Sequence, residues 1–321
     1  MRAAVVERLD GPSAIRVVDR PEPDGDGVRI AVAAAGVTFP DALLTRGLYQ
    51  LRPEPPFVPG SEVSGVVTDA PSGSGFAPGQ RVAAFPGLGG FAETVVVPPH
   101  LVFALPDEVD TEVAAGLPMN LLTVHFALLD RGRLQPGERV LVHGAAGGIG
   151  VAAIQLAAAR GAYVIAVTSS EDKAEVARVA GAHEVVAVEG FRDAVQELTA
   201  GEGVDLVLDP VGGDRVTDSL RCLRRRGRLL VVGFTAGEIP AVKVNRLLLN
   251  NLDVVGVGWG AYWLAEPGYP AQQWADLLPD LRAGRLLPPI GARHRLEGAA
   301  DAVASLEERR ATGKVLLLPG S

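Results

Sequence analysis

The segment with the clearest chemistry is a glycine-rich turn between two apolar runs. Gly144-Ala-Ala-Gly-Gly-Ile-Gly150 follows the apolar residues 139–143, and a stretch of helical composition, 151–160, leads to a second apolar run at 163–167. In a strand–turn–helix–strand unit of this kind, the first N–H groups of the helix bind phosphate. Gly147 is expected to let the backbone approach a pyrophosphate, and Gly150 to let the helix pack on the strand. We interpret the turn as a dinucleotide site, with a plain tight turn as the alternative.

The end of the second apolar run indicates which nucleotide binds. Sites for NAD have an acidic residue there, about 20 residues past the first glycine, which binds the ribose 2′-hydroxyl. Residues 168–170 are Thr-Ser-Ser, so this carboxylate is missing. Ser169 and Lys173 offer a hydroxyl and an ammonium group to a 2′-phosphate, which favours NADPH over NADH. The alternative is a helix start capped by Ser169 or Ser170, with Lys173 merely solvated, and both interpretations can hold together.

Length, charge and composition narrow the classes of protein. The 321 residues suffice for two domains, each with its own core. A net charge of −8 argues against nucleic acid or an anionic membrane as the main partner. No apolar run approaches the ~20 residues of a membrane span, and the charged start of the chain does not resemble a signal peptide. A cytoplasmic protein is expected, and the single cysteine, Cys222, excludes an internal disulfide.

The pattern of expected secondary structure changes near residue 121. Short strands separated by Gly and Pro precede it and predict a small β-barrel. Strands that alternate with helices follow it and predict a doubly wound parallel sheet. The expected strands are 2–7, 15–19, 28–33, 63–68, 81–85, 92–97, 139–143, 163–167, 184–188, 204–208, 228–232, 253–258, 292–296 and 314–318. The expected fold is therefore α/β, with residues 1–120 and 264–321 in one domain and 121–263 in the other.

Several single residues have structural interpretations. The run Arg224-Arg-Arg226 is expected to be a solvated helix end. His143 ends a buried strand and is expected to hydrogen-bond the backbone. Cys222 lies between leucines and is expected in the core. His183 is more readily a loop histidine at a strand entrance than a catalyst.

A set of motifs in a fixed order resembles one family over essentially the whole chain. The motifs are Ala34-Ala-Gly-Val37 with Asp41, Arg46-Gly-Leu-Tyr49, Pro59-Gly-Ser-Glu-Val-Ser-Gly65, Leu121-Leu-Thr123, His143–Gly150, Gly181-Ala-His183, Gly227–Gly233 and Thr312-Gly-Lys-Val315. Together they resemble the zinc-free quinone oxidoreductase branch, which includes zeta-crystallin, of the medium-chain dehydrogenase/reductase superfamily. The resemblance implies a GroES-like barrel, which is the catalytic domain, and a Rossmann coenzyme domain, with NADPH and substrate in the cleft between them. It also implies a homodimer, formed through the last sheet strand at 254–258.

The resemblance also bears on metal binding. Zinc alcohol dehydrogenases of the superfamily have a Cys where this chain has Thr38, and a His where it has Ser61. The stretch 118–123, where a third ligand is expected, contains no Cys, His or carboxylate. Tetrahedral zinc needs thiolate, imidazole or carboxylate donors. No metal is therefore expected.

Family roles transfer to matching positions of this chain. Tyr49 matches a tyrosine at the cleft, where it either donates a hydrogen bond to the substrate or stacks on the nicotinamide. Thr38 is a second candidate for catalysis, although many family members have Asn at its position. The implied cofactor contacts are Tyr49, Thr123, Ala146, Gly147, Gly148, Ile149, Ser169, Lys173, His183, Val232, Gly233, Phe234, Thr235, Val257, Gly258 and Trp259.

The expected reaction is the NADPH-dependent reduction of a quinone. Without a metal, the protein contributes positioning and electrostatics, and the nicotinamide carries the hydride. Quinones and conjugated enones suit such a site, because the charge left by the hydride is delocalised in the product. Reduction of the C=C bond of an enone or enoyl thioester is the main alternative. A protein that binds NADPH without catalysis is a further one.

Overall fold

The computed structural model describes residues 1–320, which form two compact units. Unit 1 consists of Met1–Met119 and of the residues from Pro267 to 320, and unit 2 consists of Asn120–Glu266. Unit 2 is therefore an insertion between two segments that build unit 1. The predicted α/β class is confirmed, with a mainly antiparallel sheet in unit 1 and a parallel one in unit 2.

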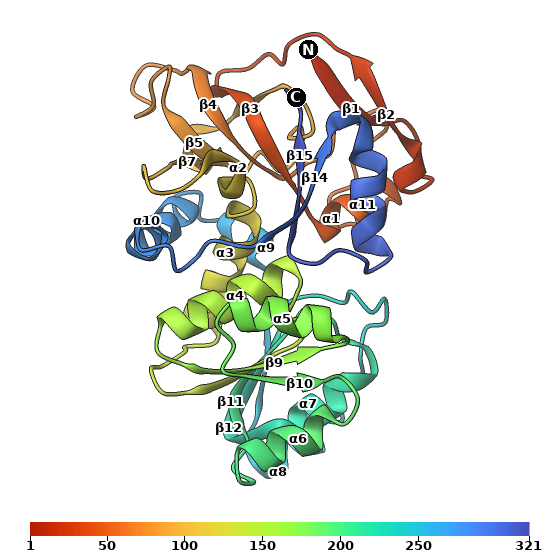
Figure 1. Ribbon diagram of the computed structural model, residues 1–321, viewed down its shortest axis with the longest axis vertical. Helices are drawn as coiled ribbons and strands as arrows, with labels where there is room; N and C mark the ends of the chain where they lie inside the picture. Colours follow the sequence, from red (N-terminus) through yellow and green to blue (C-terminus); the bar gives the residue numbers. More distant parts are fainter. Residues whose placement is uncertain (321) are drawn as a thin grey trace. The chain divides into compact units, whose positions relative to one another are not determined.

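Unit 1 joins strands from both ends of the chain into one sheet. Within residues 1–320 its order is β14-β15-β3-β4-β5-β7, with β6 also paired to β3, and β1 and β2 form a separate antiparallel pair. The bounds are β1 (Arg2–Val6), β2 (Ile15–Asp19), β3 (Val28–Val37), β4 (Glu62–Asp69), β5 (Arg81–Ala84), β6 (Thr94–Val97), β7 (Val102–Ala104), β14 (Ile290–Arg295) and β15 (Lys314–Leu318). Figure 1 shows β14 and β15, in blue, beside β3, in red.

Side chains cap the first two α-helices of unit 1, whereas the last two begin after glycines. These helices are α1 (Phe39–Thr45), α2 (Thr111–Ala114), α10 (Tyr269–Arg282) and α11 (Ala299–Glu307). Thr38 and Asp41 form a capping box that starts α1. The Asp110 carboxylate accepts hydrogen bonds from the N–H groups of Glu112 and Val113 and starts α2. These caps fix the places where the chain leaves the sheet.

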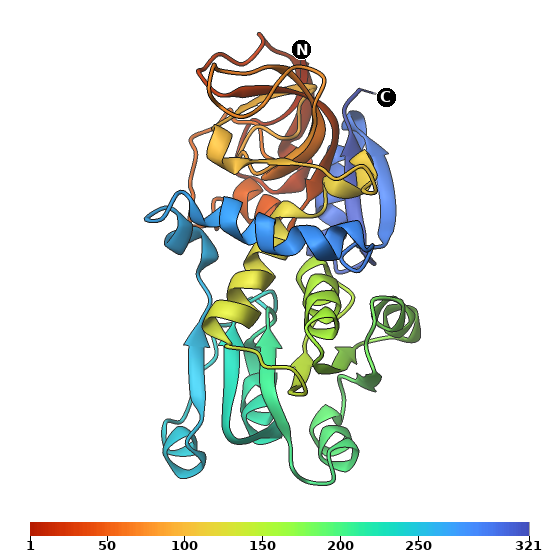
Figure 2. The same ribbon diagram turned by 90° about the vertical axis from the view of Figure 1, so that its left-hand side faces the viewer.

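Unit 2 is a parallel sheet with helices in its connections. Within the described residues its order is β10-β9-β8-β11-β12-β13, and every neighbouring pair is parallel. The strands are β8 (Arg139–Val142), β9 (Tyr163–Thr168), β10 (Glu184–Ala187), β11 (Val204–Asp209), β12 (Leu223–Val231) and β13 (Asp253–Gly256). In Figure 2 the teal and light blue arrows of β11, β12 and β13 lie side by side and point the same way.

The connecting helices of unit 2 include an α-to-π transition. The helices are α3 (Pro118–His125), α4 (Gly148–Ala159), α5 (Glu171–Val179), α6 (Phe191–Leu198), α7 (Val216–Cys222), α8 (Asn245–Asn250) and α9 (Trp259–Trp263). Helix α3 continues directly into a π-helix over Phe126–Arg131. The Nε of Arg131, at the end of this π-helix, donates to the carbonyl of Gly256 at 3.1 Å. The π-helix is thereby tied to the end of β13.

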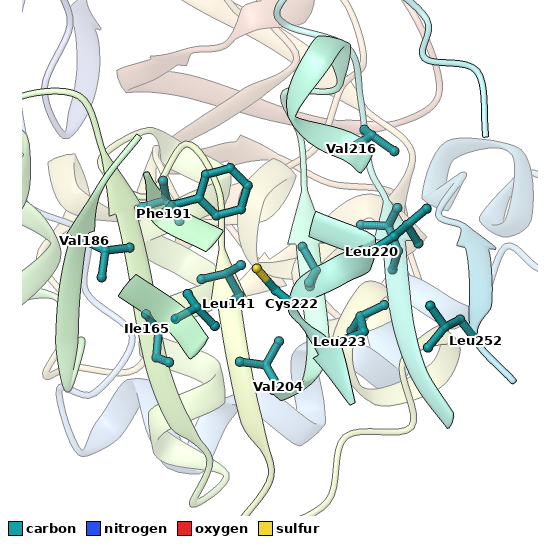
Figure 3. Packing of buried hydrophobic residues seen from close by; sticks show 14 residues of the cluster. Leu141, Ile165, Val186, Phe191, Val204, Val216, Leu220, Cys222, Leu223 and Leu252 are labelled. Atoms are coloured by element: carbon teal, nitrogen blue, oxygen red, sulfur yellow. The ribbon is translucent and has the colours of Figure 1, made fainter. Parts of the chain in front are cut away.

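One hydrophobic cluster of unit 2 lies on the face of the sheet that α6 and α7 cover. Leu141, Ile165 and Val204 come from three adjacent strands and pack with Phe191 of α6, and Cys222 lies at the end of α7 within the same cluster (Figure 3). Cys222 is fully buried, as predicted, and burial raises the pKa of its thiol to about 12. This cysteine is therefore a packing residue and is unreactive.

The prediction for the arginine run was wrong. Helix α7 ends at Cys222, and Arg224-Arg-Arg226 belongs to the start of β12. The pairing of β11 with β12 is irregular here, and Arg226 takes a left-handed conformation with φ of 64°. Arg224 forms an ion pair with the buried Asp205 of β11. Three exposed charges resemble a helix end in the sequence, but a β-bulge accommodates them equally well.

Among residues 1–320, no helix combines the length and the apolar character that crossing a membrane requires.

Candidate functional site

Most of the predicted cofactor contacts lie at one edge of the parallel sheet of unit 2. The carboxyl ends of parallel strands meet at the same edge, which is where ligands bind in open α/β sheets. Ala146, Gly147, Gly148 and Ile149 follow β8, and Ser169 and Lys173 follow β9. Val232, Gly233, Phe234 and Thr235 follow β12, and Val257, Gly258 and Trp259 follow β13. The fold thus gathers segments that lie far apart in the sequence.

Close backbone contacts fix the glycine-rich turn. A Cβ at position 150 would lie 2.3 Å from the carbonyl oxygen of Gly144, so a larger residue cannot stand there without a shift of the backbone. A Cβ on Gly148 would lie 2.6 Å from Nδ2 of Asn120. Gly147 precedes the first turn of α4 and donates its N–H to Gly144 at 2.9 Å. The turn therefore brings bare backbone to the N-terminus of α4, as a phosphate site requires.

Thr123 supplies a hydroxyl that the protein itself does not satisfy. It lies on α3 one turn after Asn120, whose side chain contacts Gly148. Its Oγ1 is buried and has no hydrogen-bond partner among residues 1–320. A buried hydroxyl without a partner costs free energy, so such a group is usually satisfied by a ligand or by water. This orphan atom fits the cofactor contact expected of Thr123.

Both interpretations of the segment after β9 are compatible with the structure. Ser170 caps α5, because its Oγ accepts the backbone N–H of Lys173 at 3.5 Å. The Nζ of Lys173 donates to Oγ of Ser169 at 3.3 Å. Ser169 is exposed. A hydroxyl and an ammonium group therefore stand together at the rim, where a 2′-phosphate would be recognised.

Backbone hydrogen bonds hold the loops after β11, β12 and β13. Val232 donates its N–H to the carbonyl of Asp209 at 3.0 Å, and Val257 donates to the carbonyl of Val231 at 3.0 Å. The buried Asp209 carboxylate accepts the N–H groups of Val211 and Gly212 at 2.8 and 3.0 Å. Backbone hydrogen bonds thus hold the first residue of each of these two predicted contact segments at the end of its strand.

His183 does not join these residues. It precedes β10, and its Nδ1 accepts the N–H of Val164, near the start of β9, at 3.0 Å. Its ring stacks on that of Tyr163, with the ring centroids 4.7 Å apart. In a parallel sheet the strand starts lie at the edge opposite the glycine turn. The expected cofactor contact of His183 does not fit this position, and the interpretation as a loop histidine at a strand entrance does.

His143 differs from its prediction as well. Its side chain bonds to the hydroxyl of Ser219 on α7 at 2.8 Å through Nε2, and not to the backbone. The Ser219 hydroxyl donates to the carbonyl of Arg215, so Nε2 of His143 is the donor in their contact. Burial lowers the pKa of His143 to about 4, and the charge of Arg215 acts in the same direction, whereas Asp209 raises it. His143 is therefore neutral and structural.

Aromatic side chains gather where α9 follows β13. The rings of Trp259 and Trp263 are 6.0 Å apart, and the ring of Tyr262 lies 5.0 Å from Phe126 at the start of the π-helix. Trp259 is buried, whereas Tyr262 is 43% exposed. The cluster joins α9 to the π-helix within unit 2.

In unit 1 a buried carboxylate organises the two predicted hydroxyls. Oδ2 of Asp41 accepts hydrogen bonds from the N–H and the hydroxyl of Thr38 at 2.8 and 2.7 Å. Its Oδ1 accepts the N–H of Gly60 at 3.0 Å. Oγ1 of Thr38 lies 3.4 Å from Oγ of Ser61. Burial raises the pKa of Asp41 to about 6, although these hydrogen bonds and the charge of Lys314 lower it.

An ion pair between distant segments lies beside this carboxylate. Lys314 on β15 contacts the Glu62 carboxylate on β4 and donates to the carbonyl of Val37 at 3.1 Å. The second oxygen of Glu62 accepts the N–H of Met119 at 2.8 Å. The sequence interpretation missed both charges. The motif Thr312-Gly-Lys-Val315 contains the lysine, but no local pattern points to its partner.

Tyr49 lies on the loop that follows α1 and is partly buried. Burial raises the pKa of its phenol, and the nearby charge of Asp41 raises it further. Thr38, Tyr49 and Asp41 therefore belong to one region of unit 1. The phenol is protonated at neutral pH and can donate a hydrogen bond.

The donor set of this region does not fit zinc. Thr38 and Ser61 contribute neutral hydroxyls, whereas tetrahedral zinc requires thiolate, imidazole or carboxylate ligands. Asp41 uses both of its oxygens to accept hydrogen bonds from the chain. Within residues 1–320, no group of three or more His, Cys, Asp and Glu side chains is arranged to hold a metal.

Comparison with known proteins identifies the family. Residues 24–107 match the alcohol dehydrogenase GroES-like domain, and residues 148–279 match the zinc-binding dehydrogenase family. Quinone oxidoreductase-like protein 2 from Bos taurus is 37% identical over 98% of this chain and 92% of its own length. The chain belongs to the quinone oxidoreductase branch of the medium-chain dehydrogenase/reductase superfamily.

Solved structures of relatives have the same fold. A probable oxidoreductase from Mycobacterium abscessus is 43% identical with a TM-score of 0.90, and the match covers 99% of each chain. The Escherichia coli quinone oxidoreductase in complex with NADPH is 28% identical with a TM-score of 0.89, over 99% of this chain and 100% of that one. The predicted fold of this branch, a GroES-like domain and a Rossmann-like parallel-sheet domain, is thereby confirmed.

Proposed function

We propose that this oxidoreductase uses NADPH to reduce quinones by hydride transfer without zinc. Unit 1 is then the catalytic domain and unit 2 the NADPH-binding domain. The observation that carries the proposal is the edge of the parallel sheet, where the glycine turn, the unsatisfied Thr123 hydroxyl and the Ser169–Lys173 pair follow the order of the family motifs. The NADPH complex of the Escherichia coli relative supports the choice of cofactor.

In this proposal each of these groups binds one part of NADPH. The N-terminus of α4 and the bare backbone of residues 146–149 bind the pyrophosphate. Ser169 and Lys173 bind the 2′-phosphate with a hydroxyl and a charge. The segments 232–235 and 257–259 offer backbone groups to the nicotinamide carboxamide. Thr123 donates its hydroxyl to the cofactor.

Bound NADPH supplies the hydride in this reaction. In unit 1 the protein supplies hydrogen-bond donors, namely the phenol of Tyr49 and the hydroxyl of Thr38. A simple ketone needs strong polarisation of its carbonyl, which a metal provides in other enzymes. A quinone delocalises the charge that it receives, so neutral donors suffice. The hydroxyl pair of Thr38 and Ser61 therefore favours a conjugated acceptor over an alcohol or simple ketone.

We also propose a homodimer that forms through β13. This strand lies at the edge of the sheet of unit 2, and Val254 is 39% exposed. An edge strand offers unpaired N–H and C=O groups to a partner strand. Light scattering that finds twice the chain mass supports the dimer, and a monomer at all concentrations contradicts it.

The deciding experiment compares two acceptors. Initial rates of NADPH oxidation are measured with a simple ortho-quinone and, in parallel, with an alkyl enone. Turnover of the quinone well above that of the enone supports the proposal. Turnover of the enone alone assigns the chain to the C=C reductases. Tight binding of NADPH with no turnover of either acceptor identifies a binding protein without this catalysis.

A further inference from the structure

The buried charges of unit 1 do not cancel. Asp41 and Glu62 are both fully buried carboxyl groups, and Lys314 is the ammonium group that faces them. Lys314 makes its direct contact with Glu62, so Asp41 forms no ion pair of its own within residues 1–320. At the end of α1, the solvent-accessible side chains of Arg46 and Glu307 pair with each other. A buried carboxyl group without a counter-ion favours its protonated form.

The hydrogen-bond network gives that proton a path. Oδ2 of Asp41 lies 2.7 Å from Oγ1 of Thr38, which lies 3.4 Å from Oγ of Ser61. Thr38 Oγ1 is the only hydrogen-bond partner of the Ser61 hydroxyl among residues 1–320. Since 3.4 Å exceeds the usual O–H···O distance, this hydroxyl can rotate between Thr38 and another acceptor. In the structure the Thr38 hydroxyl donates to the Asp41 carboxylate. Because a hydroxyl both donates and accepts, Thr38 can reverse this polarity when Asp41 is protonated: it then accepts from the carboxyl group and donates to Ser61.

We propose that Asp41, Thr38 and Ser61 form a proton relay that protonates the reduced acceptor. Ser61 is then the catalytic donor, whereas Thr38 and Asp41 act through it. The inference rests on the proposed reduction of a conjugated acceptor, because the product of hydride addition is an anion that needs a proton. Tyr49, whose phenol remains protonated near Asp41, binds the acceptor in this scheme and does not supply the proton.

Electrons and protons are conserved in the proposed step. The hydride brings both electrons, and the acceptor oxygen holds the resulting charge. The O–H bond of Ser61 breaks as a new O–H bond forms on that oxygen. Ser61 takes the proton of Thr38, and Thr38 takes the proton of Asp41, which becomes a carboxylate. After the product has left, water returns a proton to the buried Asp41 through Ser61 and Thr38, so each turnover consumes one hydride and one proton.

The test uses isosteric variants with a matched control. Thr38→Val and Ser61→Ala interrupt the relay, and Thr38→Ser retains its hydroxyl. The control is Thr45→Val: Thr45 is a buried threonine at the other end of α1, where its hydroxyl donates to the carbonyl of Ala42 at 2.7 Å. Wild-type turnover is measured first with the ortho-quinone and the enone, and the better acceptor is used for all variants.

If the relay operates, Thr38→Val and Ser61→Ala lower kcat by about 10²- to 10⁴-fold relative to Thr45→Val, as loss of a general acid does. Proton transfer then limits the rate, so the solvent isotope effect rises and the isotope effect of C4-deuterated NADPH falls toward unity. The Kd of NADPH stays that of the wild type, and Thr38→Ser restores most of kcat. A merely structural role of the hydroxyls would leave both isotope effects unchanged.

These measurements distinguish a failure of the proposed function from a failure of the relay alone. A wild type that turns over neither acceptor overturns the proposed function, and the relay falls with it. A wild type that is active, with Thr38→Val and Ser61→Ala as fast as Thr45→Val, overturns the relay alone. Slow variants with unchanged isotope effects and a raised Kd for NADPH also overturn it, because they indicate a distorted fold.

Discussion

Lys314 contacts the carboxylate of Glu62 in the interior of unit 1, where their side chains are only 3% and 0% exposed. The partners are separated by 252 positions in the chain, and the contact ties β15 to β4. Removal of one member of a buried ion pair leaves an uncompensated charge, which costs about 3–5 kcal/mol. We therefore expect Lys314→Met to destabilise the protein by that amount, measured by denaturant or thermal unfolding.

The double variant Glu62→Gln, Lys314→Met checks the cause. The glutamine carbonyl can still accept the N–H of Met119, and no charge is left without its partner. The double variant should unfold at a higher temperature than Lys314→Met alone. Equal or lower stability of the double variant would show that packing, and not the charge, dominates.

Thr123→Val should separate binding from stability. The Thr123 hydroxyl has no partner within residues 1–320, so its removal should leave the free energy of unfolding unchanged or raise it by about 1 kcal/mol. Affinity for NADPH should fall about two- to tenfold, the value of one hydrogen bond. Calorimetric titration and thermal unfolding measure the two effects.

Thr199→Val is the matched comparison for that variant. The Thr199 hydroxyl donates to the carbonyl of Val195 at 2.8 Å and accepts the N–H of Gly203 at 3.0 Å. Its loss should destabilise the protein by about 1–3 kcal/mol and leave NADPH affinity unchanged. The two valine variants should therefore show opposite patterns. A similar loss of stability in both would contradict an orphan hydroxyl at position 123.

Gly150→Ala should disrupt the turn at the start of α4. The added Cβ meets the Gly144 carbonyl oxygen at 2.3 Å, and neither backbone segment can move freely. We expect a loss of about 1–3 kcal/mol in stability and roughly tenfold weaker NADPH binding. Gly260→Ala is the control, since its Cβ meets nothing within 4 Å. Wild-type affinity in Gly150→Ala would rule out this turn as the phosphate site.

Lys173→Met should change the preference between the two nicotinamide cofactors. Without the ammonium group beside Ser169, the KM for NADPH should rise about tenfold, and the KM for NADH should stay constant. Lys243→Met removes an exposed lysine elsewhere in unit 2 and should alter neither value. Parallel changes in both KM values after Lys173→Met would contradict a role in binding the 2′-phosphate.

His143 should make stability depend on pH below neutrality. Its pKa is about 4 in the folded protein, where burial disfavours the charged ring, against 6.5 in the unfolded chain. The unfolded chain therefore binds the proton more readily, and the free energy of unfolding falls as the pH drops from 6.5 toward 4. The loss attributable to His143 is on the order of 3 kcal/mol. His143→Asn should remove it in unfolding curves taken across this range.

Asp41 should make the free energy of unfolding depend on pH in the opposite direction to His143, over an overlapping pH range. Burial raises its pKa from 3.8 to about 6, so the folded protein binds this proton more tightly than the unfolded chain. The free energy of unfolding should therefore fall as the pH rises through this interval. Asp41→Asn should remove that decline, whereas His143→Asn should make it more visible. A flat difference between Asp41→Asn and the wild type would show that Asp41 is already ionised at pH 4.

The sequence predicted the repetitive parts of the fold well because their signals are local. Apolar runs between Gly and Pro located β2 and β15 with their observed bounds. The glycine spacing at 144–150 placed a helix directly after the turn, but α4 begins at Gly148, three residues before the expected start at 151. The prediction of a helix end at 224–226 was wrong because three charges in sequence are compatible both with a helix end and with a β-bulge. Only the pairing of β12 with β11 decides between them.

The candidate site was predictable to a smaller extent. Segments that follow strands could be assigned to one edge of the sheet, but His183 precedes its strand and belongs to the other edge. Asp41 lies three positions after Thr38, a capping-box spacing that could have marked it. The pairing of Glu62 with Lys314 has no such signal, because only the tertiary fold brings β4 and β15 to the same interior.

The split construction of unit 1 sets an order of events during synthesis. Domains fold as units while the chain emerges from the ribosome. Unit 2 is continuous in sequence and can complete its sheet before β14 and β15 have been made. Until Lys314 arrives, Glu62 has no cation in the interior that forms around it. The first segment of unit 1 therefore stays incomplete until a strand that is translated after all of unit 2 has been made.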